Sequence, residues 1–131
     1  MRYLPKNILV TGGAGFIASH FVHYYQKYYP EIFIVNLDKL TYAGTLNKLQ
    51  NLCCPEQHHF VKGDILDSDL VLKLLKDFKI DTVVHFAAET HVDRSINTPE
   101  KFIKTNILGT FTLLESCRKI WLEEFGLGKS Q

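Results

Sequence analysis

The segment that decides the fold is ILVTGGAGFIA, which runs from Ile8 to Ala18. Three apolar residues predict a β-strand, the glycines predict a tight turn, and the apolar run that follows predicts a helix beginning at Phe16. Gly12 allows the backbone to turn sharply off the strand, and Gly15 has no Cβ, so a phosphate can approach the main chain. Ala18 supplies the small residue needed where the helix lies close to the strand. On its own, the segment fits either a phosphate-binding turn or a purely structural one.

An acidic residue after the next predicted strand favours the phosphate-binding interpretation. The second strand covers residues 32–37, and Asp38 follows it, 26 residues after Gly12. A carboxylate in this place is suited to bind the hydroxyl groups of an adenosine ribose, and its charge would repel a 2′-phosphate. Strand, turn, helix, strand and acid in this order predict a dinucleotide site that takes NAD rather than NADP, although the neighbouring Lys39 works against that preference.

Length and composition indicate a single globular domain. The 131 residues are 46% hydrophobic and 22% charged, and their formal net charge is +1. No basic stretch with interleaved aromatic residues is present, so we expect no nucleic-acid partner. No apolar run approaches the ~18 residues of a membrane span, and the first residues are too few and too polar for a signal peptide. We therefore expect a cytoplasmic protein that contacts no membrane.

The cysteines and histidines indicate neither a disulfide framework nor a metal centre. The cysteines are Cys53, Cys54 and Cys117, an odd set without a Cys-x-x-Cys spacing, so we expect reduced thiols. The histidine pairs at 20/23 and 58/59 match no metal-ligand pattern, and we expect no metal ion.

Apolar patterns along the chain predict alternating strands and helices. Further strands are expected at 59–62 and 82–86, and helices at 16–29, 45–52, 68–78 and from Pro99 to about 125. This alternation predicts an α/β fold, a Rossmann-type doubly wound parallel sheet that is incomplete, with four strands in the order 3-2-1-4 and flanking helices. Residues 1–125 would form the N-terminal half of an NAD-binding domain, and residues 126–131 a flexible tail.

The predicted topology places a crevice between the first and fourth strands. Ligands of open parallel sheets bind beyond the carboxyl ends of the strands, where the strand order reverses. The glycine turn would therefore face residues 87–95, and the small Ala87 and Ala88 would let the backbone come close to a cofactor. Asp64, after the third strand, would either cap the next helix or contact an adenine amino group.

Five segments, in order, resemble the dTDP-glucose 4,6-dehydratases, a group of extended short-chain dehydrogenase/reductases. The segments are GGAGFI at 12–17, LDKLTYAG at 37–44, GDI at 63–65, HFAAETHVDRS at 85–95 and TNILGT at 105–110. The second and fourth are specific to these dehydratases, and related sugar-nucleotide epimerases usually diverge there. The resemblance implies an enzyme that keeps NAD bound, takes hydride from C4 of dTDP-glucose, eliminates water across C5–C6 and returns the hydride at C6.

The resemblance also assigns roles to individual residues. It places Phe16 and Ile17 at the pyrophosphate, residues 38–41 at the adenosine ribose, and Asp64 with Ile65 at the adenine. Thr90 would meet both the nicotinamide half and the sugar nucleotide, although most of the family has serine there. The predicted cofactor-binding residues are Gly12, Gly15, Phe16, Ile17, Asp38, Lys39, Leu40, Thr41, Gly44, Asp64, Ile65, Phe86, Ala87, Ala88, Glu89, Thr90 and Thr105.

The catalytic groups of that family are absent from these 131 residues. The family takes its base from a Tyr-x-x-x-Lys motif and its elimination pair from a Thr-Asp-Glu segment, and neither motif occurs here. We therefore expect the cofactor-binding part of a dehydratase, with no catalytic residue or substrate domain, to be inactive alone. Relatives commonly dimerise through helices that include the last one, which implies a homodimer. The alternatives are a truncated, non-catalytic module that binds NAD or a partner chain, and a relative of the UDP-sugar 4-epimerases.

Overall fold

The computed structural model of the chain describes residues 3–40, 46–88, 97–124 and 126. Its sheet has the predicted parallel pairing and the predicted strand order, β3-β2-β1-β4. In register, Leu9 at the centre of the sheet lies opposite Val35 on one side and Val83 on the other. The strands are β1 (Asn7–Thr11), β2 (Phe33–Asp38), β3 (His58–Lys62) and β4 (Thr82–His85).

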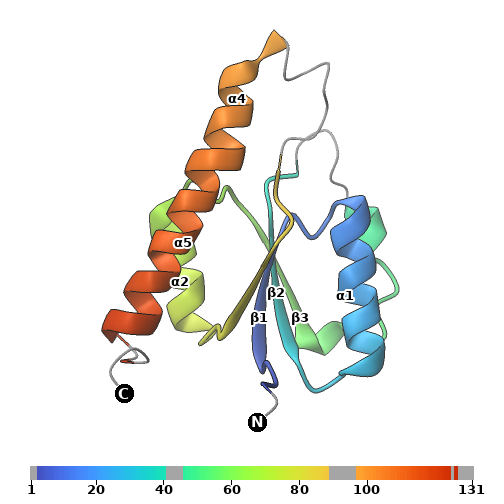
Figure 1. Cartoon of the computed structure of the whole chain (residues 1–131). Coiled ribbons are helices and arrows are strands. Elements are labelled where there is room, and N and C mark those ends of the chain that lie inside the picture. Colours follow the sequence, from blue (N-terminus) through green and yellow to red (C-terminus); the bar gives the residue numbers. More distant parts are fainter. Residues whose placement is uncertain (1–2, 41–45, 89–96, 125, 127–131) are drawn as a thin grey trace.

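The helices also follow the expected order. The α-helices are α1 (Phe16–Tyr28), α2 (Ser68–Asp77), α4 (Pro99–Ile103) and α5 (Thr110–Arg118), and two short 3-10 turns are η1 (Leu46–Leu49) and η2 (Pro55–Gln57). The π-helical segment η3 (Lys104–Gly109) joins α4 to α5, and a second one, η4 (Lys119–Glu124), continues α5, so that together they form one continuous rod (Figure 1). The expected helix at 45–52 is instead the shorter η1, and Thr45 lies outside the described residues.

Helices cover both faces of the sheet, as a doubly wound fold requires. Figure 1 shows α1 against one face, with α2 and α5 against the other. The strands supply both faces because their side chains alternate with a period of two. Ile8 and Val10 pack on the α1 side with Ala18, whereas Leu9 packs on the other side with Leu113.

Strand β4 is less buried than its sequence predicts. A nearly continuous apolar run at 82–86 is typical of a strand covered on both faces, yet all four residues of β4 are only partly buried. The reason is the position of β4 at an edge of the described sheet, where it pairs with β1 alone. Within the described ranges, no helix has the length and apolarity that a bilayer crossing requires.

Candidate functional site

The glycine turn between β1 and α1 has the backbone geometry that its sequence predicts. Gly12 adopts φ +72°, in the left-handed region that favours glycine. Its N–H donates to the Leu37 carbonyl oxygen at 2.8 Å, and the Gly15 N–H donates to the Gly12 carbonyl oxygen at 3.0 Å. The first hydrogen bond ties the turn to the carboxyl end of β2, and the second closes the turn itself.

Gly12 also allows the segment after β4 to approach the turn. A Cβ at Gly12 would lie 2.7 Å from the Ala87 nitrogen and 2.8 Å from the Ala87 Cα, closer than real Cβ atoms come to backbone. The expected juxtaposition of the turn with Ala87 is thus confirmed, at van der Waals contact. Ala18 is buried beside Ile8 and Val10, as the close approach of helix to strand requires.

The Asp38 carboxylate joins the end of β2 to the glycine turn. Its Oδ2 accepts from the Ala14 N–H at 2.9 Å, and its Oδ1 accepts from the Leu40 N–H at 2.7 Å. Each carboxylate oxygen has two lone pairs, so both can accept a further hydroxyl donor. The carboxylate is therefore fixed in position and still able to bind a ligand.

Asp64 and Lys39 form an ion pair at the neighbouring strand ends. Lys39 Nζ lies 3.1 Å from Asp64 Oδ2, and Asp64 Oδ1 accepts from the Leu66 N–H at 2.9 Å. Asp64 therefore holds the turn after β3, whereas the side chain that caps α2 belongs to Asp67, which accepts from the Leu70 N–H. The pairing offsets the positive charge of Lys39 beside Asp38.

A hydrogen-bonded chain through His85 connects β1, β4 and the long rod. The Thr110 hydroxyl donates to the Asn106 carbonyl oxygen, so it accepts from His85 Nε2–H at 3.1 Å. His85 Nδ1 is then the acceptor of the Thr11 hydroxyl proton at 2.6 Å, and Thr11 Oγ1 accepts from the Ala87 N–H at 3.3 Å. Burial lowers the pKa of His85 and so favours the neutral ring that this hydrogen-bond pattern requires.

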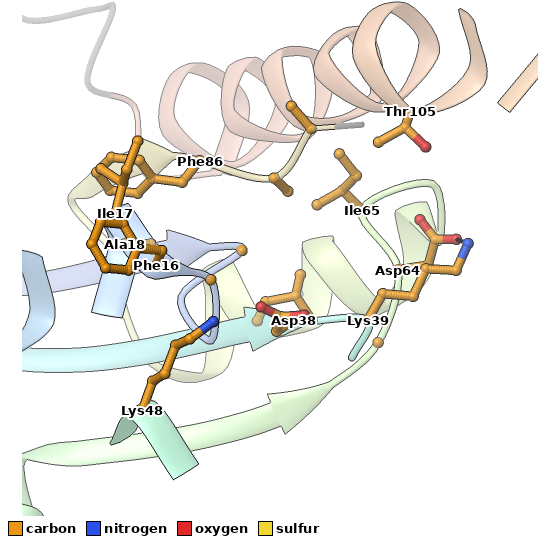
Figure 2. A pocket seen from close by; sticks show the side chains of 16 residues that line it. Phe16, Ile17, Ala18, Asp38, Lys39, Lys48, Asp64, Ile65, Phe86 and Thr105 are labelled. Carbon is orange, nitrogen blue, oxygen red and sulfur yellow. Dashed lines mark ion pairs between the residues drawn. The ribbon is translucent and has the colours of Figure 1, made fainter. Parts of the chain in front are cut away.

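These elements enclose a cavity of about 440 Å³ beyond the carboxyl ends of the strands (Figure 2). Its volume falls in the ~300–1,000 Å³ range of cofactor sites. The lining residues that the sequence predicts are Gly12, Gly15, Phe16, Ile17, Asp38, Lys39, Asp64, Ile65, Phe86, Ala87, Ala88 and Thr105.

The remaining predicted residues lie elsewhere or cannot be placed. Leu40 is described, but it does not line the cavity. Thr41, Gly44, Glu89 and Thr90 lie outside the described residues. The lining residues that sequence reasoning missed are Ala18, Leu37, Lys48 and Gly63, of which only Lys48 is charged.

The cavity fits an anionic cofactor. No side chain caps the N-terminus of α1, and the first turn of α1 contains no acidic residue. Gly15, Phe16 and Ile17 line the cavity at this terminus, where the unpaired N–H groups and the positive end of the helix dipole attract anions. A Cβ at Gly15 would approach only the Gly12 carbonyl oxygen, at 3.2 Å, so the cavity side of Gly15 is open.

No cysteine lines this cavity, and the described residues form no metal-binding cluster. Cys53, Cys54 and Cys117 are free thiols, as expected, and none lines the cavity. In the part of the chain that the structure describes, no group of three His, Cys, Asp or Glu side chains is arranged to hold a metal ion.

A doubly wound sheet with a glycine turn, an uncapped helix N-terminus and an acid at the end of β2 defines a Rossmann-type nucleotide-binding domain. The chain belongs to the GDP-mannose 4,6 dehydratase family, whose model matches residues 9–127.

Curated relatives give the same assignment. A dTDP-glucose 4,6-dehydratase of Xanthomonas campestris is 54% identical over 113 residues, which are 86% of this chain and 32% of that protein. A trifunctional enzyme of Arabidopsis thaliana, with UDP-glucose 4,6-dehydratase activity in its name, is 51% identical over 116 residues, or 88% of this chain and 18% of that protein. The chain therefore spans about a third or less of these relatives.

A solved structure matches the fold of the chain closely. The dTDP-glucose 4,6-dehydratase DesIV of Streptomyces venezuelae, crystallised with NAD and TYD, aligns with a TM-score of 0.77 and 45% identity. The alignment covers 85% of this chain and 35% of that protein.

Proposed function

We propose that this chain is the cofactor-binding part of an NAD-dependent sugar-nucleotide 4,6-dehydratase that converts dTDP-glucose to dTDP-4-keto-6-deoxyglucose. The observation that carries the proposal is the cavity, which brings the glycine turn, Asp38 and the end of β4 together. The names of the relatives in Xanthomonas and Streptomyces support the reaction and the cofactor.

The residues around the cavity suit the parts of NAD. In this proposal, the N–H groups of Phe16 and Ile17 bind the pyrophosphate, and the Asp38 carboxylate accepts from the adenosine ribose hydroxyls. Asp64 and Ile65 meet the adenine, while Phe86, Ala87, Ala88 and Thr105 border the nicotinamide. When bound, the nicotinamide ring supplies reversible hydride acceptance. We assign Leu40, Thr41, Gly44, Glu89 and Thr90 to the same cofactor on the family pattern alone.

The charges around Asp38 support a preference for NAD over NADP. A 2′-phosphate would lie against the fixed Asp38 carboxylate, and the two negative charges would repel each other. Lys39 would counter this repulsion if its ammonium were available, but Lys39 Nζ lies 3.1 Å from Asp64 Oδ2. The ion pair thus preserves the preference.

Chemistry on the sugar requires groups that these 131 residues do not contain. No tyrosine in the chain stands four residues before a lysine, and no Thr-Asp-Glu segment occurs. We therefore propose that the chain binds NAD but does not turn over a nucleotide sugar. Sequencing the coding DNA beyond Gln131 distinguishes a dehydratase segment from a non-catalytic module, because only the former continues into both motifs.

Product analysis shows which nucleotide the sugar substrate carries and whether the reaction is dehydration or epimerisation. The Arabidopsis relative is named for UDP-glucose, so a protein that includes this segment should be supplied with dTDP-glucose and with UDP-glucose. A 4-keto-6-deoxy product from dTDP-glucose supports the proposal. An epimerised product from a UDP-sugar would instead support the epimerase alternative.

The apolar face of the long rod supports a homodimer, for which we also propose a cytoplasmic location. Ile107, Phe111 and Leu114 are 62%, 62% and 66% exposed along one side of η3 and α5. We propose that a second copy covers this face. Phe111→Glu should then shift the molecular mass measured by light scattering from dimer to monomer, whereas Tyr28→Glu on α1 should not. Three free cysteines support a reducing compartment.

Calorimetric titration tests the cofactor assignment. The chain is titrated with NAD and with NADP, beside an Asp38→Ala variant. We expect NAD to bind more tightly than NADP, and the variant to narrow the difference. Failure of a folded chain to bind either dinucleotide would refute the cofactor site.

A further inference from the structure

The 3-10 turn η1 packs on α1 and belongs to none of the segments for which the sequence predicts cofactor binding. Leu49 packs against the cluster that contains Val22 of α1. His23 Nε2 donates to the Lys48 carbonyl oxygen at 2.9 Å. These two contacts fix the backbone of Lys48 and leave its side chain to point elsewhere.

The Lys48 side chain points into the cofactor cavity. Figure 2 shows it running from η1 toward the glycine turn, with its ammonium group between Phe16 and Asp38. Lys48 lines the cavity together with Gly12 and Gly15. With Phe16 it also borders a shallower hollow of about 390 Å³, lined by Ser19, His20 and His23. Lys48 therefore stands at the outer wall of the cavity, beside the turn.

The two lysines that line the cavity lie in different parts of it. Lys39 pairs with Asp64 at 3.1 Å, away from the turn. The Lys48 ammonium lies on the side of the uncapped N-terminus of α1, whose first turn has no acidic residue. A side-chain cation and the positive end of a helix dipole thus face the same volume, an arrangement that favours an anion.

We propose that Lys48 binds the pyrophosphate of the dinucleotide from the outer wall of the cavity, beside the glycine turn. The inference rests on the proposed function, since it names a further ligand for the same cofactor. The ammonium supplies a charge-assisted hydrogen bond to a phosphate oxygen, whereas the turn supplies main-chain N–H donors. Affinity for NAD consequently falls with rising salt concentration, because one of the phosphate contacts is a side-chain charge.

The test compares Lys48→Gln with Lys48→Arg and with a matched control, Lys73→Gln. Lys73 is an exposed residue on α2 that does not line the cavity, so this control removes one positive charge elsewhere. The titrants are NAD, NADP and adenosine. The contact between η1 and α1 uses the Lys48 carbonyl oxygen, so all variants should fold, which circular dichroism verifies.

We expect Lys48→Gln to weaken NAD binding on the order of tenfold, which is the size of one charge-assisted hydrogen bond. Lys48→Arg should stay within about threefold of the unchanged chain, since it retains the charge, and adenosine affinity should not change. Equal losses in Lys48→Gln and Lys73→Gln would overturn the inference. A loss confined to NADP would also overturn it, because the ammonium would then face a 2′-phosphate. If the unchanged chain binds no NAD, both the proposed function and the inference fail.

Discussion

Replacement of Gly12 by alanine tests how closely the glycine turn and the end of β4 are packed. Gly12 combines φ +72° with a Cβ position only 2.7 Å from the Ala87 nitrogen. The left-handed conformation costs an alanine about 1–2 kcal/mol. Contact with rigid backbone adds about 1–3 kcal/mol, and lost freedom of the unfolded chain returns about 0.4–1 kcal/mol. We expect Gly12→Ala to lower the free energy of unfolding by about 1–5 kcal/mol.

Gly126 provides a matched control for this substitution. It has φ +68°, but a Cβ there would meet nothing within 4 Å. Gly126→Ala therefore carries the conformational cost alone, about 0–1.6 kcal/mol after the unfolded-state gain. Urea denaturation followed by circular dichroism measures both variants. Equal losses in the two variants would show that the contact between Gly12 and Ala87 does not constrain the turn.

Three further predictions concern the histidine, cysteine and aspartate side chains. Burial lowers the pKa of both His58 and His85, so the unfolded chain binds more protons below about pH 6.5, and stability should fall as pH decreases from 7 to 5.5. A flat profile of unfolding free energy over that window would contradict the buried, neutral state of these rings. Burial raises the pKa of Cys117 to about 11, so a thiol reagent at pH 8 should modify exposed Cys53 quickly and Cys117 only on unfolding. Equal rates of modification at Cys53 and Cys117 in the folded chain would refute the burial of the Cys117 thiol. Asp38→Asn leaves one of the two backbone N–H groups that bind the carboxylate without its acceptor. We expect this change to lower the free energy of unfolding by about 1–3 kcal/mol, measured by urea denaturation. An unchanged urea midpoint would contradict this prediction.

The fold and the turn could be predicted because their signals are local. Position 12 requires glycine for its backbone conformation, and glycine at position 15 lets a phosphate approach the main chain. The alternation of apolar segments indicates a parallel doubly wound sheet. Asp38, the acid at the end of β2, could be identified by its place in this order. The residues that appear in both the predicted set and the cavity are consequently Gly12, Gly15, Phe16, Ile17, Asp38, Lys39, Asp64, Ile65, Phe86, Ala87, Ala88 and Thr105.

What the sequence could not show depends on contacts between distant segments. Lys48 belongs to no motif, and it reaches the cavity only because Leu49 and His23 hold η1 on α1. The chain of hydrogen bonds from Thr11 through His85 to Thr110 likewise joins residues far apart in sequence. Side-chain identity at such positions gives no local signal, since the same residues occur on any solvated surface.

The burial of β4 illustrates a different limit. An apolar run predicts coverage on both faces, but the burial of an edge strand depends on which strands lie beside it. The sequence of β4 contains no information on that neighbour.

The central claim is that the cavity beside the glycine turn is the NAD site, and amide chemical-shift mapping tests it most directly. An isotope-labelled chain is titrated with NAD, and the shifts of the backbone N–H signals are assigned to residues. We expect the largest changes at residues 12–17, 38–39, 64–65 and 86–88, with little change along α5. A folded spectrum that does not respond to millimolar NAD, or changes concentrated on the apolar face of the rod, would contradict the claim.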